Sequence, residues 1–332
     1  MKRFTPIVAG LVAALVLSLG ATTPGLAATP RQIALGVSES DSTNMQAVDH
    51  FTAAAGRKPA IWSLWSDWGN PGSGPFPTDA ANGLLARGIV PMVYWEPIDP
   101  SNQNDCTHWA LQNIINGDHD AYIRQWAQAA KAYGGTIILR FAHENNGYWY
   151  IWGNGRCTNT AKKFQKAWQH VWNIFRGKNG VGATNVKFLY SVINTNYVKA
   201  DYPGNKYVDY LGLTALDWGI SSRKQKWQPL VTLMTPAMKV LRSISTTKPI
   251  IGAEIAAGYN PTCAKCDKAT FLSQGYPAVY AKWPQIVAMV YLDFDLSAQP
   301  NQSNWRLDSP ASAMTAYQNL LKDQRFQGTF PH

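Results

Sequence analysis

Eight short apolar segments that alternate with helix-like segments are the feature that most constrains the fold of this chain. The apolar segments are rich in β-branched and aromatic residues, as parallel strands buried on both faces require. They cover residues 33–37, 60–64, 90–94, 136–141, 186–192, 210–216, 249–254 and 286–294. Because a helix can return the chain from each strand to the next, this alternation predicts an α/β fold, a single-domain (β/α)8 TIM barrel.

The segments between the strands carry apolar residues at helical spacing. In the clearest case they recur on one helix face, at Phe164, Trp168, Val171, Trp172 and Phe175. We therefore assign Trp168 and Trp172 to the core. A doubly wound sheet is the alternative fold, but it normally has a glycine-rich turn after its first strand. The residues at that point, Gly36-Val-Ser-Glu39, do not form such a turn.

The N-terminal segment has the features of a secretory signal peptide. Met1-Lys2-Arg3 is basic, residues 7–19 are mostly apolar, and small residues dominate residues 21–28. This order is typical of a cleaved signal, whereas a membrane helix needs about 20 predominantly apolar residues. We predict that residues 1–27 are removed on export and that residues 28–332 form the secreted domain, with no membrane attachment.

The charge of the chain is positive but dispersed. The net charge is +10, and removal of Lys2 and Arg3 leaves 28 basic against 20 acidic residues, a net charge of +8. Basic residues occur in short groups such as Lys162-Lys163, without the clustered basic strip of nucleic-acid-binding proteins. We interpret the charge as a solubilising surface rather than a site for nucleic acid or an anionic wall polymer, and we expect a monomer.

The four cysteines are expected to form disulfides. Their number is even, and export would place them in an oxidising compartment, where four cysteines allow three pairings. Cys263 and Cys266 form a C-x-x-C motif, but the sequence has neither the second motif nor the spaced histidine pair of a zinc site. We therefore favour two structural disulfides, Cys106–Cys157 and Cys263–Cys266, and predict no metal.

Two glutamates lie at the ends of the fourth and seventh predicted strands. Glu144 follows residues 136–141, and Glu254 ends residues 249–254. In a (β/α)8 barrel this is the end of the strands that carries function, and a carboxylate there costs free energy unless it is paired or used. Cleavage of a glycosidic bond uses two carboxyl groups. The alternative is that each glutamate only forms a structural ion pair, for example with Arg140.

Tryptophans gather at the same strand ends. The chain has 14 Trp, and flat aromatic rings edged by polar groups suit the apolar faces of sugars. Those next to predicted strand ends are Trp62, Trp65, Trp68, Trp95, Trp149, Trp152 and Trp218. Their position indicates a carbohydrate-binding rim.

Other common active-site motifs are missing from the sequence. His143-Glu144 does not continue into the metal-binding pattern H-E-x-x-H, because residue 147 is glycine. A G-x-S-x-G nucleophile elbow and a phosphate-binding P-loop are also missing. The sequence therefore predicts no cofactor.

The segment around Glu144 carries the strongest resemblance to a known family. It reads Arg140-Phe-Ala-His143-Glu144-Asn-Asn-Gly147-Tyr-Trp149-Tyr-Ile-Trp152-Gly153. It resembles the acid/base segment of glycoside hydrolase family 26, which contains β-mannanases within the retaining clan of (β/α)8 hydrolases. The resemblance implies that Glu144 is the acid/base with His143 as its oriented neighbour. It also implies that Glu254, at the end of strand seven, is the nucleophile and that Trp149 lines the site.

The chain departs from the family pattern after strand six. Many relatives have an aspartate and then a tyrosine that hydrogen-bonds the nucleophile, where this chain has Thr214 and Leu216. Asp217 and Trp218 are the residues that we expect to compensate.

The predicted site combines the strand-end positions with the resemblance. Strand eight has Tyr291 where the clan commonly has a sugar-stacking tryptophan, and weaker similarity lies at residues 202–209 and 304–308. The residues predicted to bind substrate are His143, Trp149, Trp152, Trp95, Trp218 and Tyr291.

The predicted function is retaining, endo-acting hydrolysis of β-1,4-mannan. Retention requires the two carboxyl groups to lie about 5–5.5 Å apart. Two alternatives stay open: the same mechanism on β-1,3-xylan or mixed-linkage β-glucan, and a barrel that binds glycan without cutting it. The Cys106–Cys157 bridge is expected to brace the loop that carries Trp149 and Trp152.

Overall fold

The computed structural model describes residues 1, 30–69, 74–219, 226–260, 263, 266–300 and 302–330. It divides into two units, residues 1–31 and 32–332, and every helix and strand of the described ranges belongs to the second unit. Apart from Met1, the predicted signal peptide lies outside the described residues. Within the described ranges, no helix is both long and apolar enough to cross a membrane.

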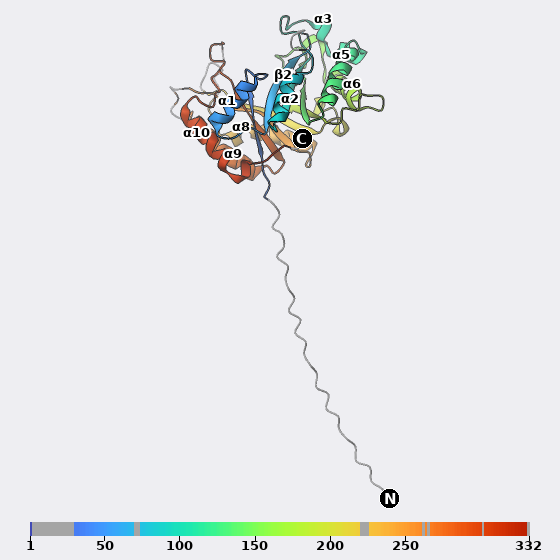
Figure 1. Ribbon diagram of the computed structural model, residues 1–332. Coiled ribbons are helices and arrows are strands. Elements are labelled where there is room, and N and C mark those ends of the chain that lie inside the picture. The colour runs from blue at the N-terminus through green and yellow to red at the C-terminus, as the bar shows by residue number, and fades with distance from the viewer. Residues whose placement is uncertain are drawn as a thin grey trace. The chain divides into compact units, whose positions relative to one another are not determined.

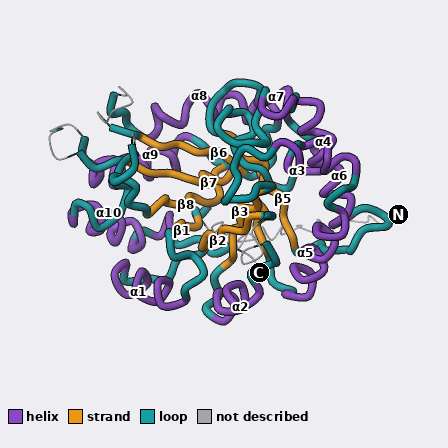
Figure 2. The backbone as a smooth tube through the Cα atoms, turned by 90° about the horizontal axis from the view of Figure 1, so that it is seen from above, coloured by secondary structure: helices purple, strands orange, loops and turns teal. Residues whose placement is uncertain are grey.

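Eight parallel strands close into a barrel in chain order, with β8 paired to β1. Figure 2 shows the strands at the centre with helices around them. The strands are β1 (Ala34–Glu39), β2 (Ile61–Asp67), β3 (Val90–Glu96), β4 (Ile137–Phe141), β5 (Val186–Val192), β6 (Tyr210–Asp217), β7 (Ile250–Ala257) and β8 (Ile286–Asp293). The predicted (β/α)8 barrel is confirmed.

The described residues contain ten α-helices, nine between consecutive strands and α10 after β8. Figure 1 labels most of them. They are α1 (Met45–Ala55), α2 (Thr78–Ala86), α3 (Cys106–Trp109), α4 (Leu111–Asn116), α5 (Asp120–Tyr133), α6 (Ala161–Arg176), α7 (Val198–Asp201), α8 (Leu230–Ile244), α9 (Lys268–Lys282) and α10 (Ala311–Lys322). The apolar face predicted for residues 164–175 is the buried face of α6, and Trp168 and Trp172 are core residues as predicted.

Several strands extend beyond their predicted ends. β2 reaches Asp67 and β3 reaches Glu96, because the two strands stay paired in register to these polar residues. β7 likewise continues to Ala257, so Glu254 lies inside the strand. Hydrophobic periodicity marks where a strand is buried on both faces, whereas backbone pairing continues into the polar rim of the barrel.

The side chains of a strand point alternately into the barrel and toward the helices, and this places two predicted site residues outside the cleft. In β3, Met92 and Tyr94 belong to the cluster inside the barrel, whereas Val93 and Trp95 pack between the strands and the helices. Successive strand residues point to opposite faces, so Trp95 faces α5, where its Nε1 donates to the Tyr122 hydroxyl at 3.2 Å. Trp95 is a core residue, and its predicted role in substrate binding is wrong.

Tyr291 is corrected for the same reason. In β8, Ala288 and Val290 face the barrel interior, and Met289 and Tyr291 face the helices. Tyr291 is fully buried there. It does not take the place of the tryptophan that stacks on sugar in the clan.

Candidate active site

An open cleft of about 700 Å³ lies over the carboxyl ends of the strands. Both predicted catalytic glutamates, Glu144 and Glu254, line it. The aromatic residues in its lining are Trp149, Tyr150, Trp218 and Trp305. A cleft at this end of a (β/α)8 barrel is the expected position of an active site.

A β-bulge directs Glu254 toward the cleft. Leu213 pairs with Gly252 and Thr214 pairs with Glu254, so Ala253 is an extra residue on β7. A bulge changes the direction of the side chains that follow it. As a result, Glu254 and the inward-facing Thr214 lie side by side at the barrel mouth.

Glu144 reaches the same place from a loop. It lies three residues after the end of β4, and its backbone has φ of +54°, in the left-handed region. Its N–H donates to the carbonyl of Ser191 on β5 at 2.9 Å. One carboxylate oxygen of Glu144 then lies within 4.8 Å of one of Glu254. This proximity agrees with the roughly 5–5.5 Å separation of the two carboxyl groups in retaining glycosidases.

Arg140 provides a fixed positive charge between the two glutamates. Its side chain is fully buried, its Nη1 donates to Glu254 Oε2 at 2.7 Å, and its Nη2 lies 3.7 Å from Glu144 Oε1. Nη2 also donates to the Thr214 hydroxyl at 2.7 Å. The ion pair considered as an alternative to catalysis is therefore present, but it binds Glu254 closely and leaves that carboxylate at the cleft.

The surroundings of Glu144 favour its protonated form near neutral pH. Burial, followed by the nearby charge of Glu254, raises the pKa of Glu144 to about 7. Arg140 and hydrogen bonds from Thr214 and Trp149 act in the opposite direction. The Thr214 hydroxyl donates to Oε1 at 2.5 Å, and Trp149 Nε1 donates to Oε2 at 3.1 Å. Two carboxyl groups in such different environments can serve as acid and as nucleophile.

Arg140, and not Asp217, contacts the predicted nucleophile Glu254. The Asp217 carboxylate accepts the backbone N–H groups of Gly219 at 2.8 Å and Gln228 at 2.6 Å, which holds the loop after β6. The expectation that Asp217 compensates at the nucleophile is therefore wrong. Trp218, the other residue named for this role, lines the cleft.

His143 is a buried neighbour of Glu144. Its Nε2 lies 3.0 Å from the Tyr150 hydroxyl, and its Nδ1 lies 3.6 Å from Glu96 Oε1. Burial and the charge of Arg140 hold the pKa of His143 well below its usual value, so the imidazole is neutral. His143 is absent from the lining of the cleft, and its contact with the Tyr150 hydroxyl links the two ends of the segment 143–150.

Trp152 supports the loop and does not line the cleft. It is buried, its Nε1 donates to the carbonyl of His143 at 2.8 Å, and its ring stacks on Tyr150 at 4.3 Å. Its predicted contact with substrate is therefore corrected to a packing role.

The aromatic surface of the cleft differs in part from the predicted one. Trp149 is 44% exposed and Trp218 packs edge-on against Trp305, with ring centroids 4.6 Å apart. Tyr150 and Trp305 were not among the predicted site residues. Trp305 lies in residues 304–308, a segment with weaker similarity to family 26. That similarity was the feature of the sequence that could have indicated Trp305 as a site residue.

In the described residues, one group of three side chains has the spacing of metal ligands. It consists of His143, Glu144 and Glu254. Each offers one ligand atom, and these atoms lie within 4.8 Å of one another. Arg140 already pairs with Glu254 and approaches Glu144. A further cation would therefore meet a permanent like charge, which argues against a metal at this position.

The sequence matches the family model of glycosyl hydrolase family 26 over residues 103–308. This stretch contains both glutamates and the strands from β4 to β8. The chain belongs to glycosyl hydrolase family 26.

Curated relatives of this family 26 chain are longer proteins. Endoglucanase H of Acetivibrio thermocellus is 31% identical over 284 residues, which are 83% of this chain and 29% of the relative. A mannan endo-1,4-beta-mannosidase of Bifidobacterium adolescentis is 30% identical over 185 residues, which are 53% of this chain and 16% of the relative. The chain thus spans less than a third of the length of these two relatives.

Solved structures of family 26 proteins share the fold. The catalytic domain of an endo-beta-1,4-mannanase from Bacillus sp. JAMB-750 superimposes with a TM-score of 0.66 at 18% identity, covering 89% of this chain and 87% of that one. A β-mannanase from Bacteroides ovatus gives a TM-score of 0.65 at 14% identity, covering 91% and 92%.

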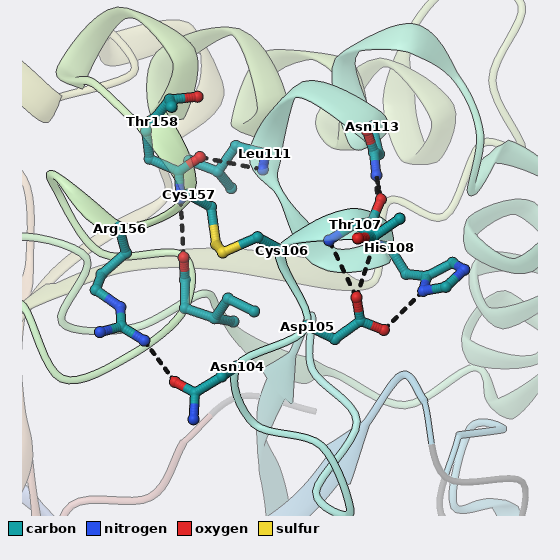
Figure 3. Close-up of a disulfide and its surroundings, with 12 residues drawn as sticks. Asn104, Asp105, Cys106, Thr107, His108, Leu111, Asn113, Arg156, Cys157 and Thr158 are labelled. Atoms are coloured by element: carbon teal, nitrogen blue, oxygen red, sulfur yellow. Dashed lines mark hydrogen bonds and ion pairs between the residues drawn. A yellow bond between two sulfur atoms is a disulfide. The ribbon is translucent and has the colours of Figure 1, made fainter.

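Both predicted disulfides are present, and one of them joins two loops at the cleft side of the barrel. Cys106 begins α3, after β3, and Cys157 lies in the loop after β4 that carries Trp149. Figure 3 shows this bridge beside a hydrogen bond from Arg156 to Asn104, 2.6 Å long, that links the same loops. The bridge therefore has the position expected of a brace for the loop after β4.

Replacing Cys106 and Cys157 with serine should raise KM for polysaccharide clearly and lower Tm only slightly. The reason is that the loop that presents Trp149 would lose its brace. The matched control replaces Cys263 and Cys266, which close a loop with a sequence separation of 3. Steady-state kinetics and thermal unfolding check this. An unchanged KM in the first variant would count against the bracing role.

Trp149 is expected to act both as a sugar platform and on the ionisation of Glu144. The hydrogen bond from Trp149 to Glu144 lowers the pKa of that carboxyl. Trp149→Phe keeps an aromatic face but removes this hydrogen bond, so the pKa of Glu144 should rise. The alkaline limb of kcat/KM should therefore shift to higher pH with a small change in KM. Trp149→Ala should in addition raise KM, by roughly 10-fold for the loss of one stacking contact. Identical pH profiles for wild type and Trp149→Phe would contradict this.

Proposed function

We propose that this family 26 protein is a secreted, retaining, endo-acting glycoside hydrolase that cleaves β-1,4-mannan-type polysaccharide. The observation that carries the proposal is a pair of carboxyl groups at an open cleft, with one oxygen of each within 4.8 Å of the other. One of them has a pKa raised to about 7, and the other has a buried arginine as its partner.

In the first step, Glu254 attacks the anomeric carbon while Glu144 donates its proton to the oxygen of the leaving sugar. A covalent glycosyl-enzyme forms, and the glycosidic bond breaks. In the second step, Glu144, now a carboxylate, removes a proton from water as the water oxygen attacks the same carbon. The bond to Glu254 breaks, and both glutamates return to their starting states.

The network around Arg140 suits both steps. Arg140 donates to Glu254 Oε2 at 2.7 Å and so orients the side chain that attacks. When Glu254 becomes an ester, its charge is lost, and one of the two main causes of the raised pKa of Glu144 disappears with it. The pKa of Glu144 then falls. This change favours the carboxylate that the second step requires.

The cleft suits a neutral sugar chain. Trp149, Trp218 and Trp305 provide aromatic surfaces beside the glutamates, and Lys226 is the one cationic residue among the described residues of the lining. The groove is open to solvent, as an enzyme that cuts within a polymer requires. Mannan endo-1,4-beta-mannosidases among the relatives support mannan as the substrate class.

A β-glucan is the second candidate substrate. It is favoured by a relative that covers 83% of this chain and is named an endoglucanase. The same mechanism would then act on a β-linked glucose polymer, and β-1,3-xylan is a third polymer that belongs in the same comparison.

The test is a reducing-end assay of residues 28–332 on mannan, glucomannan, xylans and mixed-linkage β-glucan. We expect the highest kcat/KM on mannan or glucomannan, a rapid fall in viscosity from internal cuts, and a β-anomeric first product by NMR. Binding to insoluble mannan without release of reducing ends would instead support a glycan-binding barrel. An α-anomeric first product would contradict retention.

Export is tested separately, by expression of the full chain in a secreting host. We expect protein in the medium with an N-terminus at or near residue 28. Retention of the full-length chain inside the cell would contradict the signal peptide.

A further inference from the structure

A buried carboxyl group outside the cleft holds both ends of the loop that carries Glu144. Asp201 is the last residue of α7, in the connection between β5 and β6, and is fully buried. Its Oδ2 accepts the Nδ2 hydrogens of Asn145 and of Asn154, each at 2.7 Å. Asn145 directly follows Glu144, and Asn154 lies near the far end of the same loop.

The loop requires such support because its backbone is unfavourable. Ala142 and Glu144 have φ of +43° and +54°, a left-handed conformation that costs free energy for residues other than glycine and persists where the surroundings hold it. The Asn154 N–H donates to the Asn145 carbonyl at 2.9 Å and closes the loop. Asp201 contacts the side chains of the same two residues, so it holds the loop at the point where it closes.

The polar atoms around Asp201 are only partly satisfied. Asp201 Oδ1 and Asn145 Oδ1 are buried and have no hydrogen-bond partner among the residues that the structure describes. Burial raises the pKa of Asp201 to about 7 against the opposing hydrogen bonds from the two asparagines. A neutral carboxyl carries a donor hydrogen, as an asparagine amide does. An asparagine at residue 201 would therefore keep a side-chain oxygen that accepts from Asn145 and Asn154. Its amide hydrogens could donate to Asn145 Oδ1, which has no partner among the described residues.

We propose that Asp201 is a positioning residue for Glu144: it joins Asn145 and Asn154 to the β5–β6 connection and thereby fixes the Glu144 carboxyl beside the scissile bond. The inference rests on the proposed function, because it assigns to Asp201 the placement of the proton donor. Asp201 itself is not one of the residues that line the cleft.

The test uses two substrates that differ in their need for a proton. The leaving sugar of a polysaccharide is a poor leaving group and depends on the acid. The dinitrophenolate of a dinitrophenyl β-glycoside of the same sugar leaves without protonation. Asp201→Leu should lower kcat/KM on polysaccharide by on the order of 100-fold, the effect of a displacement of about 1 Å. On the dinitrophenyl glycoside it should lower kcat/KM by less than about 5-fold. Asp201→Asn should stay within about 3-fold of wild type on both.

A matched control separates positioning from stability. Asp209 lies in the same connection, but its carboxylate accepts from the Phe188 N–H at 2.7 Å and from Arg176 at 3.0 Å, away from the loop after β4. Asp209→Leu should lower Tm without changing the ratio of the two activities. If Asp201→Leu does not fold, Asn145→Ala removes one contact of the same carboxyl and should show the same selective loss.

The outcomes distinguish the two proposals. A wild-type protein that is inactive on both substrates would overturn the hydrolase function and this inference with it. An active wild type whose Asp201→Leu and Asn145→Ala variants lose both activities equally, or lose neither, would overturn the role of Asp201 alone.

Discussion

Replacing Glu254 with alanine is expected to lower kcat on polysaccharide by on the order of 10⁴-fold or more, the loss found when a covalent nucleophile is removed. Substrate binding should change little, because the aromatic residues of the cleft are separate from the reacting carboxylate. Equilibrium binding of an oligosaccharide and steady-state kinetics would measure the two effects. Near-normal turnover in this variant would refute the assignment of Glu254 as the nucleophile.

The control for this variant is Glu254→Gln. Alanine leaves the buried Arg140 without its closest partner, and removal of one member of a buried ion pair typically costs about 3–5 kcal/mol. Glutamine keeps an oxygen that can accept from Arg140 Nη1 but is a far poorer nucleophile. If the chemistry is lost because the nucleophile is absent, Glu254→Gln should be equally inactive while its Tm stays closer to that of the wild type.

Azide gives a direct chemical test of the alanine variant. With a dinitrophenyl β-glycoside as substrate, azide can enter the space left by the carboxylate and attack the anomeric carbon in one displacement. The bond to the dinitrophenolate breaks, and the product is an α-glycosyl azide, with inverted configuration. A β-glycosyl azide from Glu254→Ala would show that the nucleophile is still present and therefore lies elsewhere.

The second large effect is expected for Glu144→Ala. General acid catalysis contributes typically 10²–10⁴-fold, so kcat/KM on polysaccharide should fall by roughly that factor. On the dinitrophenyl glycoside, whose leaving group needs no proton, kcat/KM should fall by less than about 10-fold. Azide should here give the β-glycosyl azide, because Glu254 still forms the glycosyl-enzyme and azide then replaces water. Equal losses on the two substrates would contradict the role of Glu144 as the acid.

The pH dependence of the wild type tests the same assignment. The first step requires protonated Glu144, whose pKa burial raises to about 7. The value of kcat/KM on polysaccharide should therefore fall as pH rises through about 7, by about tenfold per pH unit beyond it. Glu144→Gln, which cannot titrate, should lack this limb. A limb that persists in Glu144→Gln would have to belong to another group.

The sequence alone was sufficient to predict the fold and the position of the two glutamates at one end of the barrel. Eight buried parallel strands leave a periodic apolar signal that does not depend on the exact end of any strand. The segment around Glu144 is also specific enough to indicate the family, since it combines the acid with a histidine and spaced aromatic residues. The disulfide pairing could be predicted because Cys263 and Cys266 lie close together in the chain and leave one other pair.

The tertiary structure decided which of the aromatic residues face the cleft. Neighbouring strand residues point to opposite sides, so an error of one residue exchanges the core and the site: Trp95 packs against helices, while Glu96 lies near His143. Trp152 and Tyr150 are two residues apart in the loop after β4, where no such alternation holds. Trp152 was predicted to bind substrate, but Tyr150, for which no role was predicted, is the residue that lines the cleft.

The electrostatic network was likewise visible only in three dimensions. Arg140, Thr214 and Glu254 come from three strands, and they meet because an extra residue in β7 shifts its pairing with β6. A bulge of this kind leaves no periodic signal in the sequence. The chain thus determines by itself that two carboxyl groups stand at one end of a barrel. The raised pKa of Glu144 depends on burial and on contacts between residues distant in the sequence, which only the folded structure brings together.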